Sequence, residues 1–243
     1  MTAIAEPRVE LIAHTAIVPD AIEQRLEIQE GSTDAETLTV YAGRSCYESW
    51  SRPNEKTRED KDYLRRTLFE QGHFSILEHA SATFYLTGVS RALLAEITRH
   101  RHLSFSVMSQ RFVDESEANI VIPPAVRRSN ARVTYASEDF RDDLAGDIPE
   151  ALGWWGQEAV WNYETIVDAL TGEGLPRKQA REAARAVLPN MTETKIVVTG
   201  NLRAWHEVIE RRTAPDADAE FQQVAGLIRD ELRKLAPEVF PEP

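Results

Sequence analysis

The stretch Arg99-His100-Arg101-His102-Leu103-Ser104-Phe105-Ser106-Val107-Met108-Ser109-Gln110-Arg111 concentrates positive charge in an otherwise acidic chain. Three arginines and two histidines fall within it, although the 243 residues of the chain carry a formal net charge of -12. Such close cationic donors repel one another unless an anion lies among them. Three serines and a glutamine add neutral donors that suit phosphate oxygens and the edge of a heterocycle. The stretch therefore predicts a site for an anionic ligand, with a solvated basic patch as the alternative.

The composition limits what that ligand is and where the protein works. A pI near 5.0 argues against a general nucleic-acid binder, because sequence-independent binding of polymer phosphates needs a basic surface. The single cysteine, Cys46, allows no internal disulfide and fits a reducing compartment, and we expect it to be a small buried thiol. The first ten residues do not resemble a signal peptide, and no apolar run approaches the ~20 residues of a membrane span. We expect a cytoplasmic protein with no membrane partner.

Hydrophobic periodicity predicts a mixture of strands and helices. Alternating segments rich in β-formers predict strands at 8–18, 80–89 and 192–200. Amphipathic spacing with capping residues predicts helices at 33–50, 60–71, 91–101, 148–170, 176–188, 202–213 and 216–235. The polar segment 127–147 has no clear period and is expected to be loop with a short helix. Without repeats or a long linker, the chain 1–243 is predicted to form one α+β domain.

Two further clusters have ordinary structural interpretations. Trp154, Trp155 and Trp161 lie on the expected helix at 148–170, where tryptophans belong to a core or a subunit interface more often than to a cofactor site. The segment 73–79 holds two histidines and a glutamate, but no thiolate or third histidine stands nearby at helical spacing. A zinc site is therefore not predicted, and we expect no metal.

Arginines at the ends of separate elements point to a shared ligand. Arg99, Arg111, Arg185 and Arg212 have no local acidic partner in the sequence. The guanidinium group offers a rigid fork of donors that suits phosphate and the carbonyl edge of a pyrimidine. Arg177, Arg181 and Arg185 also recur every four residues, a spacing typical of a solvated helix face. Neither G-x-x-x-x-G-K-[ST] nor G-x-G-x-x-G occurs, so the usual nucleotide loops are not supported.

Four ordered motifs resemble one known family. Arg99-His100-Arg101, seven further residues and Ser109 match R-H-R-x7-S, the signature of the flavin-dependent thymidylate synthases. The likeness includes G-H-x-S-x-x-E-H at 72–79, A-R-x-V-L-P at 184–189, and T-G-N-x-R-A-W followed by an arginine at 199–212. Together these blocks cover roughly residues 70–225.

The resemblance implies an activity and an assembly. The expected reaction is the reductive methylation of dUMP to dTMP, a step of de novo thymidylate synthesis. Methylenetetrahydrofolate supplies the one-carbon unit, and FAD reduced by NADPH supplies the hydride. The implied fold is α+β, with an antiparallel-rich sheet flanked by long helices. The implied assembly is a homotetramer whose active sites are shared between subunits.

The resemblance also assigns roles to residues. Flavin contacts are implied at His73, Ser75, Glu78, Arg99, His100, Arg101, Val107, Asn201, Leu202, Arg203 and Glu207. Contacts with dUMP are implied at Glu96, Ile97, Thr98, Arg99, Val107, Met108, Ser109, Gln110, Arg111, Arg185 and Arg212. The catalytic role falls to Arg212, which would lie at the uracil edge and stabilise negative charge as N3 loses its proton. A guanidinium aimed at developing charge in a dry site is a strong form of electrostatic catalysis.

The nucleophile and three departures from the family pattern need comment. Cys46 lies in an upstream helix without surrounding arginines, and the alcohol of Ser109 would need an adjacent base to attack the pyrimidine. We therefore interpret Ser109 as a hydrogen-bonding residue, with a nucleophile as the alternative. Val107 replaces a usual glutamate or glutamine, which leaves only its backbone for a ligand. Glu207 and Asp216 replace asparagine or histidine and add negative charge near the expected flavin.

Two other functions remain open from the sequence. The first is an RNA- or DNA-binding module that uses the 99–111 stretch, although the acidic pI and the scarcity of interleaved aromatic residues weigh against it. The second is a flavoprotein of this fold that has lost synthase activity.

Overall fold

The computed structural model describes residues 3–134 and 145–242. Its centre is a four-stranded antiparallel sheet in the order β1-β2-β6-β3, formed by Arg8–His14, Ser81–Ser90, Glu193–Asn201 and Ser104–Val107. A second, two-stranded sheet pairs β4 (Arg132–Thr134) with β5 (Ala145–Asp147). These strands with their surrounding helices confirm the predicted α+β class and its antiparallel sheet.

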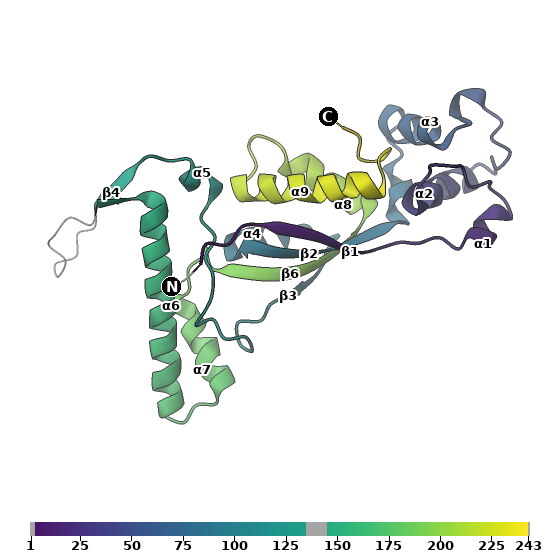
Figure 1. Cartoon of the computed structure of the whole chain (residues 1–243). Helices are drawn as coiled ribbons and strands as arrows, with labels where there is room; N and C mark the ends of the chain where they lie inside the picture. Colours follow the sequence, from purple (N-terminus) through teal and green to yellow (C-terminus); the bar gives the residue numbers. More distant parts are fainter. Residues whose placement is uncertain (1–2, 135–144, 243) are drawn as a thin grey trace.

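The helices gather in three places around the sheet. Figure 1 shows α8 (Leu202–Arg212) and α9 (Ala219–Leu235) along one face, with α4 (Arg91–Ile97) beside the strands. At one end lie α1 (Pro19–Glu23), α2 (Asp34–Ser45) and α3 (Asp60–Arg65), the last continuing into a π-helical turn, Arg66–Glu70. At the other end stand α5 (Pro124–Arg127), α6 (Ile148–Gly172) and α7 (Arg177–Ala184). Short 3₁₀ helices form at Glu55–Thr57, Phe74–Glu78 and Arg185–Val187.

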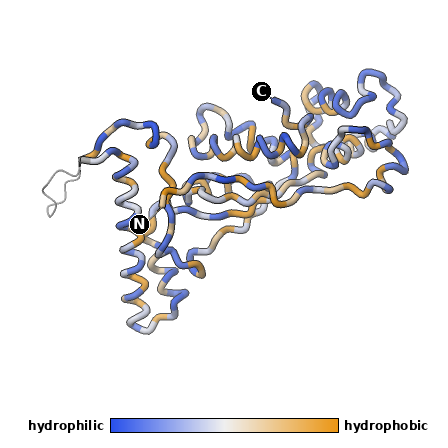
Figure 2. Tube along the Cα trace, viewed as in Figure 1, coloured by the Kyte–Doolittle hydropathy of each residue, from blue (hydrophilic) through white to orange (hydrophobic). Residues whose placement is uncertain are grey.

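The main core lies between the sheet and the α8–α9 layer. Alternate residues of β2 and β6 point toward it, and their side chains are fully buried at Phe84, Leu86, Ile196 and Val198. Trp205 of α8 fills the centre, packing edge-on against Phe84 with ring centroids 5.1 Å apart. Its indole N–H donates to the Ala82 carbonyl oxygen at 3.0 Å, so the buried polar atom has a partner. The hydrophobic residues in Figure 2 follow these strands and the inner side of α9.

A small second cluster joins α6 to α7. Its buried members are Tyr163, Val167, Ala180 and Ala184. The alanines let the two helices approach closely, which fixes the end of α7 relative to α6.

Capping explains why several elements begin where the sequence predicts. The Thr33 side chain accepts from the Glu36 amide while the Glu36 carboxylate accepts from the Thr33 amide, a reciprocal pair that starts α2. Ser90 caps α4, and its hydroxyl also donates to Glu220 Oε2 at 2.6 Å. Asn201 ends β6 and caps α8 by accepting from the Ala204 amide at 2.8 Å.

Several boundaries and three elements differ from the predictions. The strand expected at 8–18 ends at His14, and the helix expected at 33–50 ends at Ser45, shortly before Glu48, whose φ is +49°. The helix expected at 91–101 ends at Ile97 and is followed by turns. Strands β3, β4 and β5 were not predicted, because three or four residues carry too little periodicity to register. Part of the expected loop at 127–147 lies outside the described residues.

The burial predicted for Cys46 is wrong, and of the two interpretations of the tryptophans, the core of this chain is excluded. Cys46 is exposed, because it follows the last residue of α2 on the side that faces solvent. The side chains of Trp154, Trp155 and Trp161 are 52%, 39% and 62% exposed, so they do not belong to the core of this chain. Their other interpretation, a subunit interface, stays a prediction. Among the described residues, no helix has the length and apolar character to cross a membrane.

Two glycines offer a matched test of this fold. Gly88 in β2 has a φ of +65°, and a Cβ there would lie 1.9 Å from the Glu6 carbonyl oxygen. Gly88→Ala should therefore lower the free energy of unfolding by at least about 2 kcal/mol. Gly226 lies within α9 with no atom near its Cβ position, so Gly226→Ala should raise that free energy by roughly 0.5–1 kcal/mol. Denaturant unfolding measures both, and equal effects would contradict the described backbone.

Candidate active site

The end of α8 brings one arginine against residues from two other elements. Arg212 donates from Nε to His100 Nε2 at 2.9 Å and from Nη1 to Glu96 Oε2 at 3.2 Å. Glu96 lies on α4, and His100 lies in the turn that follows it. The guanidinium also sits over the ring of Phe221 from α9, 4.7 Å from its centroid. Only a fifth of the Arg212 side chain is exposed, so this charge is oriented and partly desolvated.

The imidazole of His100 is held in its neutral form. Burial and the neighbouring charges of Arg212 and Arg211 lower the pKa of His100, while Glu207 and Glu96 oppose that shift. Because Nε2 accepts from Arg212, the ring proton belongs on Nδ1. Neutral His100 therefore orients Arg212 without adding a second positive charge.

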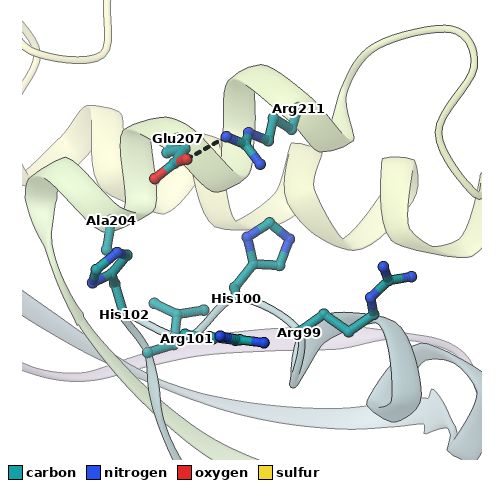
Figure 3. Close-up of a pocket in the computed structure, with 8 residues that line it drawn as sticks. Arg99, His100, Arg101, His102, Ala204, Glu207 and Arg211 are labelled. Atoms are coloured by element: carbon teal, nitrogen blue, oxygen red, sulfur yellow. Dashed lines mark ion pairs between the residues drawn. The ribbon is translucent and has the colours of Figure 1, made fainter.

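Beside this cluster lies a cavity of about 210 Å³ between the 99–103 turn and α8. It is lined by Arg99, His100, Arg101, His102, Leu103, Ala204, Glu207 and Arg211. Figure 3 shows the arginines and histidines on the turn facing the Glu207–Arg211 ion pair on α8. The lining offers many N–H donors and one carboxylate, which is the environment that a phosphate-bearing ligand with a polar ring requires.

The other expected flavin residues extend this region along α8. Arg203 forms an ion pair with Glu78 of the Phe74–Glu78 turn, and both side chains are about half exposed. His73 and Ser75 are exposed on the same turn. The side chain of Asn201 already caps α8. The 73–78 segment and α8, distant in sequence, are therefore joined at the surface.

A second group of predicted residues lies at the other end of β3. Ser109 follows this strand, and Arg111 Nη1 is 3.5 Å from Glu182 Oε2 of α7. Arg185 is exposed directly after α7. Among the described residues, no hydrogen bond or ion pair joins Arg111 or Arg185 to the Arg212 cluster. In Figure 1, α7 lies with α6 at one end of the sheet, whereas α8 lies with α9 along one face. One chain therefore presents the predicted dUMP residues in two places.

Four predicted contact residues have little or no side chain to offer a ligand. Ile97 and Leu202 are fully buried in the core, and Gln110 is 7% exposed. Val107 packs against the main core from β3, as its apolar side chain requires. Their backbone groups remain the only contacts they can make, whereas the side chains of Thr98 and Met108 retain exposed surface.

Sequence reasoning missed Arg91 and Phe221. Burial lowers the pKa of Arg91; the charge of Glu115 raises it and the charge of Arg185 lowers it further, so both side chains lie within electrostatic range of Arg91. A signal existed, because an arginine at the first position of a helix opposes the helix dipole and needs another reason to be there. Phe221 carried no signal, since its spacing in α9 is that of any core residue.

Comparisons with known proteins now decide the family. The sequence pattern of the family described as "Thymidylate synthase complementing protein" matches residues 28–238. A probable flavin-dependent thymidylate synthase of Mycobacterium phage L5 is 45% identical over 97% of this chain and 96% of its own. The flavin-dependent thymidylate synthase of Mycobacteroides abscessus is 43% identical over 99% and 91%.

The chain belongs to the flavin-dependent thymidylate synthases.

Solved structures share this fold at lower sequence identity. Thymidylate synthase X from Helicobacter pylori, solved with FAD and dUMP, aligns with a TM-score of 0.61 at 19% identity, over 98% of this chain and 100% of that one. A UMP/dUMP methylase, PolB from Streptomyces cacaoi, solved with 5-Br dUMP, aligns with a TM-score of 0.69 at 22% identity, over 99% and 95%. The thymidylate synthase fold therefore covers almost the whole chain.

The lowered pKa of His100 gives a prediction about stability. In the unfolded chain this histidine takes up a proton near the ordinary histidine pKa of 6.5, whereas the folded environment lowers its pKa and delays that uptake to lower pH. The stability it contributes is therefore present above pH 6.5 and is lost as pH falls below it. Between pH 7.5 and 5.5 the unfolding free energy should fall less steeply for His100→Gln than for the unchanged protein. Identical slopes in denaturant titrations would mean that His100 titrates normally in the fold.

Proposed function

We propose that the protein reductively methylates dUMP to dTMP, with methylenetetrahydrofolate as the one-carbon donor and NADPH as the reductant of bound FAD. The observation that carries this proposal is Arg212, held by Glu96 and neutral His100 beside a cavity rich in arginine. Family membership indicates the class of reaction. The geometry adds an oriented positive charge, Arg212, that can stabilise negative charge on the substrate.

The residues around the cavity fit a flavin dinucleotide. Arg99, Arg101 and Arg211 bring guanidinium groups to one opening, where the negative pyrophosphate of FAD would relieve their mutual repulsion. Glu207 pairs with Arg211 one helical turn away, so the added negative charge is balanced within α8. We assign flavin contacts to this lining, and to Glu78 and Arg203 at its edge. When bound, FAD supplies the hydride that completes the methyl group.

Arg212 performs the electrostatic part of the reaction. A guanidinium group stays protonated at neutral pH, so it does not take the N3 proton; that proton passes to solvent water, and Arg212 stabilises the uracil anion that remains. The added electron density makes C5 nucleophilic toward the one-carbon unit. The hydrogen on C5 then leaves as a proton. Glu96 and His100 hold the guanidinium during this change, which keeps its donors directed at one point.

The second group binds the nucleotide phosphate in this proposal. Ser109, Arg111 and Arg185 lie where β3 and α7 end, and Arg91 adds a fourth donor beside Arg185. Because one chain presents this group away from Arg212, we propose that subunits of a homotetramer combine the two groups into shared sites. The exposed tryptophans of α6 supply apolar surface for such contacts. We further propose one domain over 1–243, acting in the cytoplasm.

Arg212→Ala tests the catalytic assignment. Tritium release from 5-³H-dUMP, with FAD, NADPH and methylenetetrahydrofolate present, should occur with the unchanged protein and fall by about 10²–10³-fold in the variant. The flavin absorbance of the variant should persist, because the flavin contacts lie elsewhere. The neighbouring change Arg211→Ala is the control. This variant should bind FAD more weakly, but at saturating FAD it should release tritium as the unchanged protein does. Near-normal turnover in Arg212→Ala would contradict the mechanism.

The same tritium-release assay, run once with labelled dUMP and once with labelled UMP, defines the substrate. We expect turnover of dUMP. A protein that takes up flavin but releases no tritium would support the alternative of a flavoprotein without synthase activity. A preparation that takes up no FAD would contradict both.

Ser109→Ala separates the two roles of that hydroxyl. As a hydrogen-bonding residue, Ser109 contributes about 0.5–1.5 kcal/mol to binding, so the KM for dUMP should rise several-fold with measurable turnover left. Steady-state kinetics and calorimetric binding of dUMP provide the measurement. Complete loss of turnover with unchanged dUMP affinity would instead identify Ser109 as the nucleophile.

A further inference from the structure

One arginine of the expected solvated stripe on α7 is not solvated. The side chain of Arg181 is 14% exposed, whereas Arg177 and Arg185, one turn to either side, are exposed. Arg181 Nη1 donates to the Phe112 carbonyl oxygen at 2.7 Å, and Nη2 forms an ion pair with Asp114. Arg181 therefore binds the segment that follows Ser109–Arg111 through two groups, the backbone carbonyl of Phe112 and the carboxylate of Asp114.

The segment that Arg181 binds, residues 112–114, forms a compact turn with Ser109. The amides of Phe112 and Val113 both donate to the Ser109 carbonyl oxygen, at 3.1 and 2.9 Å. A displacement of residues 112–114 would therefore move Ser109 and Arg111 with them. On its far side the segment is tied to α6, because the Glu115 amide donates to the Tyr163 hydroxyl at 3.4 Å.

The charges of this contact are well matched. Burial would raise the pKa of Asp114, but hydrogen bonds from Ser116 and Arg181 lower it below its ordinary value, so its carboxylate stays ionised. A mostly covered guanidinium bonded to one carboxylate and one carbonyl holds a narrower geometry than a fully exposed surface pair does. Its rigidity extends along α7, which ends at Ala184, directly before Arg185.

We propose that Arg181 and Asp114 form a clip that sets the spacing between the Ser109–Arg111 turn and Arg185, and thereby shapes the phosphate half of the dUMP site. This inference rests on the proposed function. Both are positioning residues: neither needs to touch the nucleotide. Arg111 and Arg185 come from segments 74 residues apart in the sequence. The clip joins the first segment to α7, which ends directly before Arg185, and the more exposed Arg111–Glu182 ion pair is a second contact between them.

The test compares binding of dUMP with binding of deoxyuridine, which lacks the phosphate, using the FAD-loaded protein. Arg181→Ala should weaken dUMP binding by about tenfold, because misplaced donors lose their phosphate geometry, and should leave deoxyuridine affinity within about twofold. Asp114→Asn, which keeps the shape of the side chain, should give a smaller change in the same direction. In turnover, both should raise the KM for dUMP more than they lower kcat.

Arg177→Ala is the matched control, since it removes an exposed arginine one turn away on the same helix. It should leave both affinities unchanged. If both clip variants bind dUMP as the unchanged protein does, or lose deoxyuridine to the same extent as dUMP, the positioning role is wrong. If the unchanged protein binds no dUMP, the proposed function fails, and the clip has no nucleotide site to shape.

Discussion

The antiparallel pairing of β6 with β2 on one side and β3 on the other is the constraint on which both halves of the site depend. Ile196 and Val198 of β6 are completely buried, and burying side chains of this kind contributes about 1.5–3 kcal/mol each. At the end of β6, Asn201 caps α8 and so directs Arg203, Glu207 and Arg212 along one helix. Through its other neighbour, β6 also places both ends of β3: the 98–103 turn before it and Ser109 after it.

Acidic and neutral partners surround part of the positive charge that gathers near Arg212 and the cavity. Glu96 attracts Arg212, and His100 stays neutral because burial and two arginines oppose its protonation. Glu207 is a departure from the family pattern, yet it pairs with Arg211 instead of facing the cavity alone. The negative charge of Glu207, which the sequence placed near the expected flavin, is therefore balanced by the positive charge of Arg211. The other guanidinium groups that line the cavity belong to Arg99 and Arg101, to which our proposal assigns the anionic flavin.

The sequence determined which elements form and which chemistry they carry. Caps at Thr33, Ser90 and Asn201 mark helix starts, because a side-chain oxygen there satisfies an amide that the helix leaves open. Alternation in β2 and β6 reflects one buried face, so the long strands were predictable. The four motifs identified the family, because ligand chemistry restricts residue types at fixed spacing. Local signals failed for β3, whose four residues are defined only by the partner strand.

The tertiary structure alone decided how residues far apart in sequence meet. Glu96, His100, Arg212 and Phe221 come from α4, the turn after it, α8 and α9, and no local pattern encodes their contacts. The same is true of Arg181, whose spacing is that of a solvated arginine stripe, yet whose side chain is mostly covered and paired with Asp114. Cys46 and the α6 tryptophans show the converse, since apolar character did not ensure burial within this chain. Side-chain chemistry and periodicity are local properties, whereas burial and charge pairing depend on which distant surfaces the sheet and helices bring together.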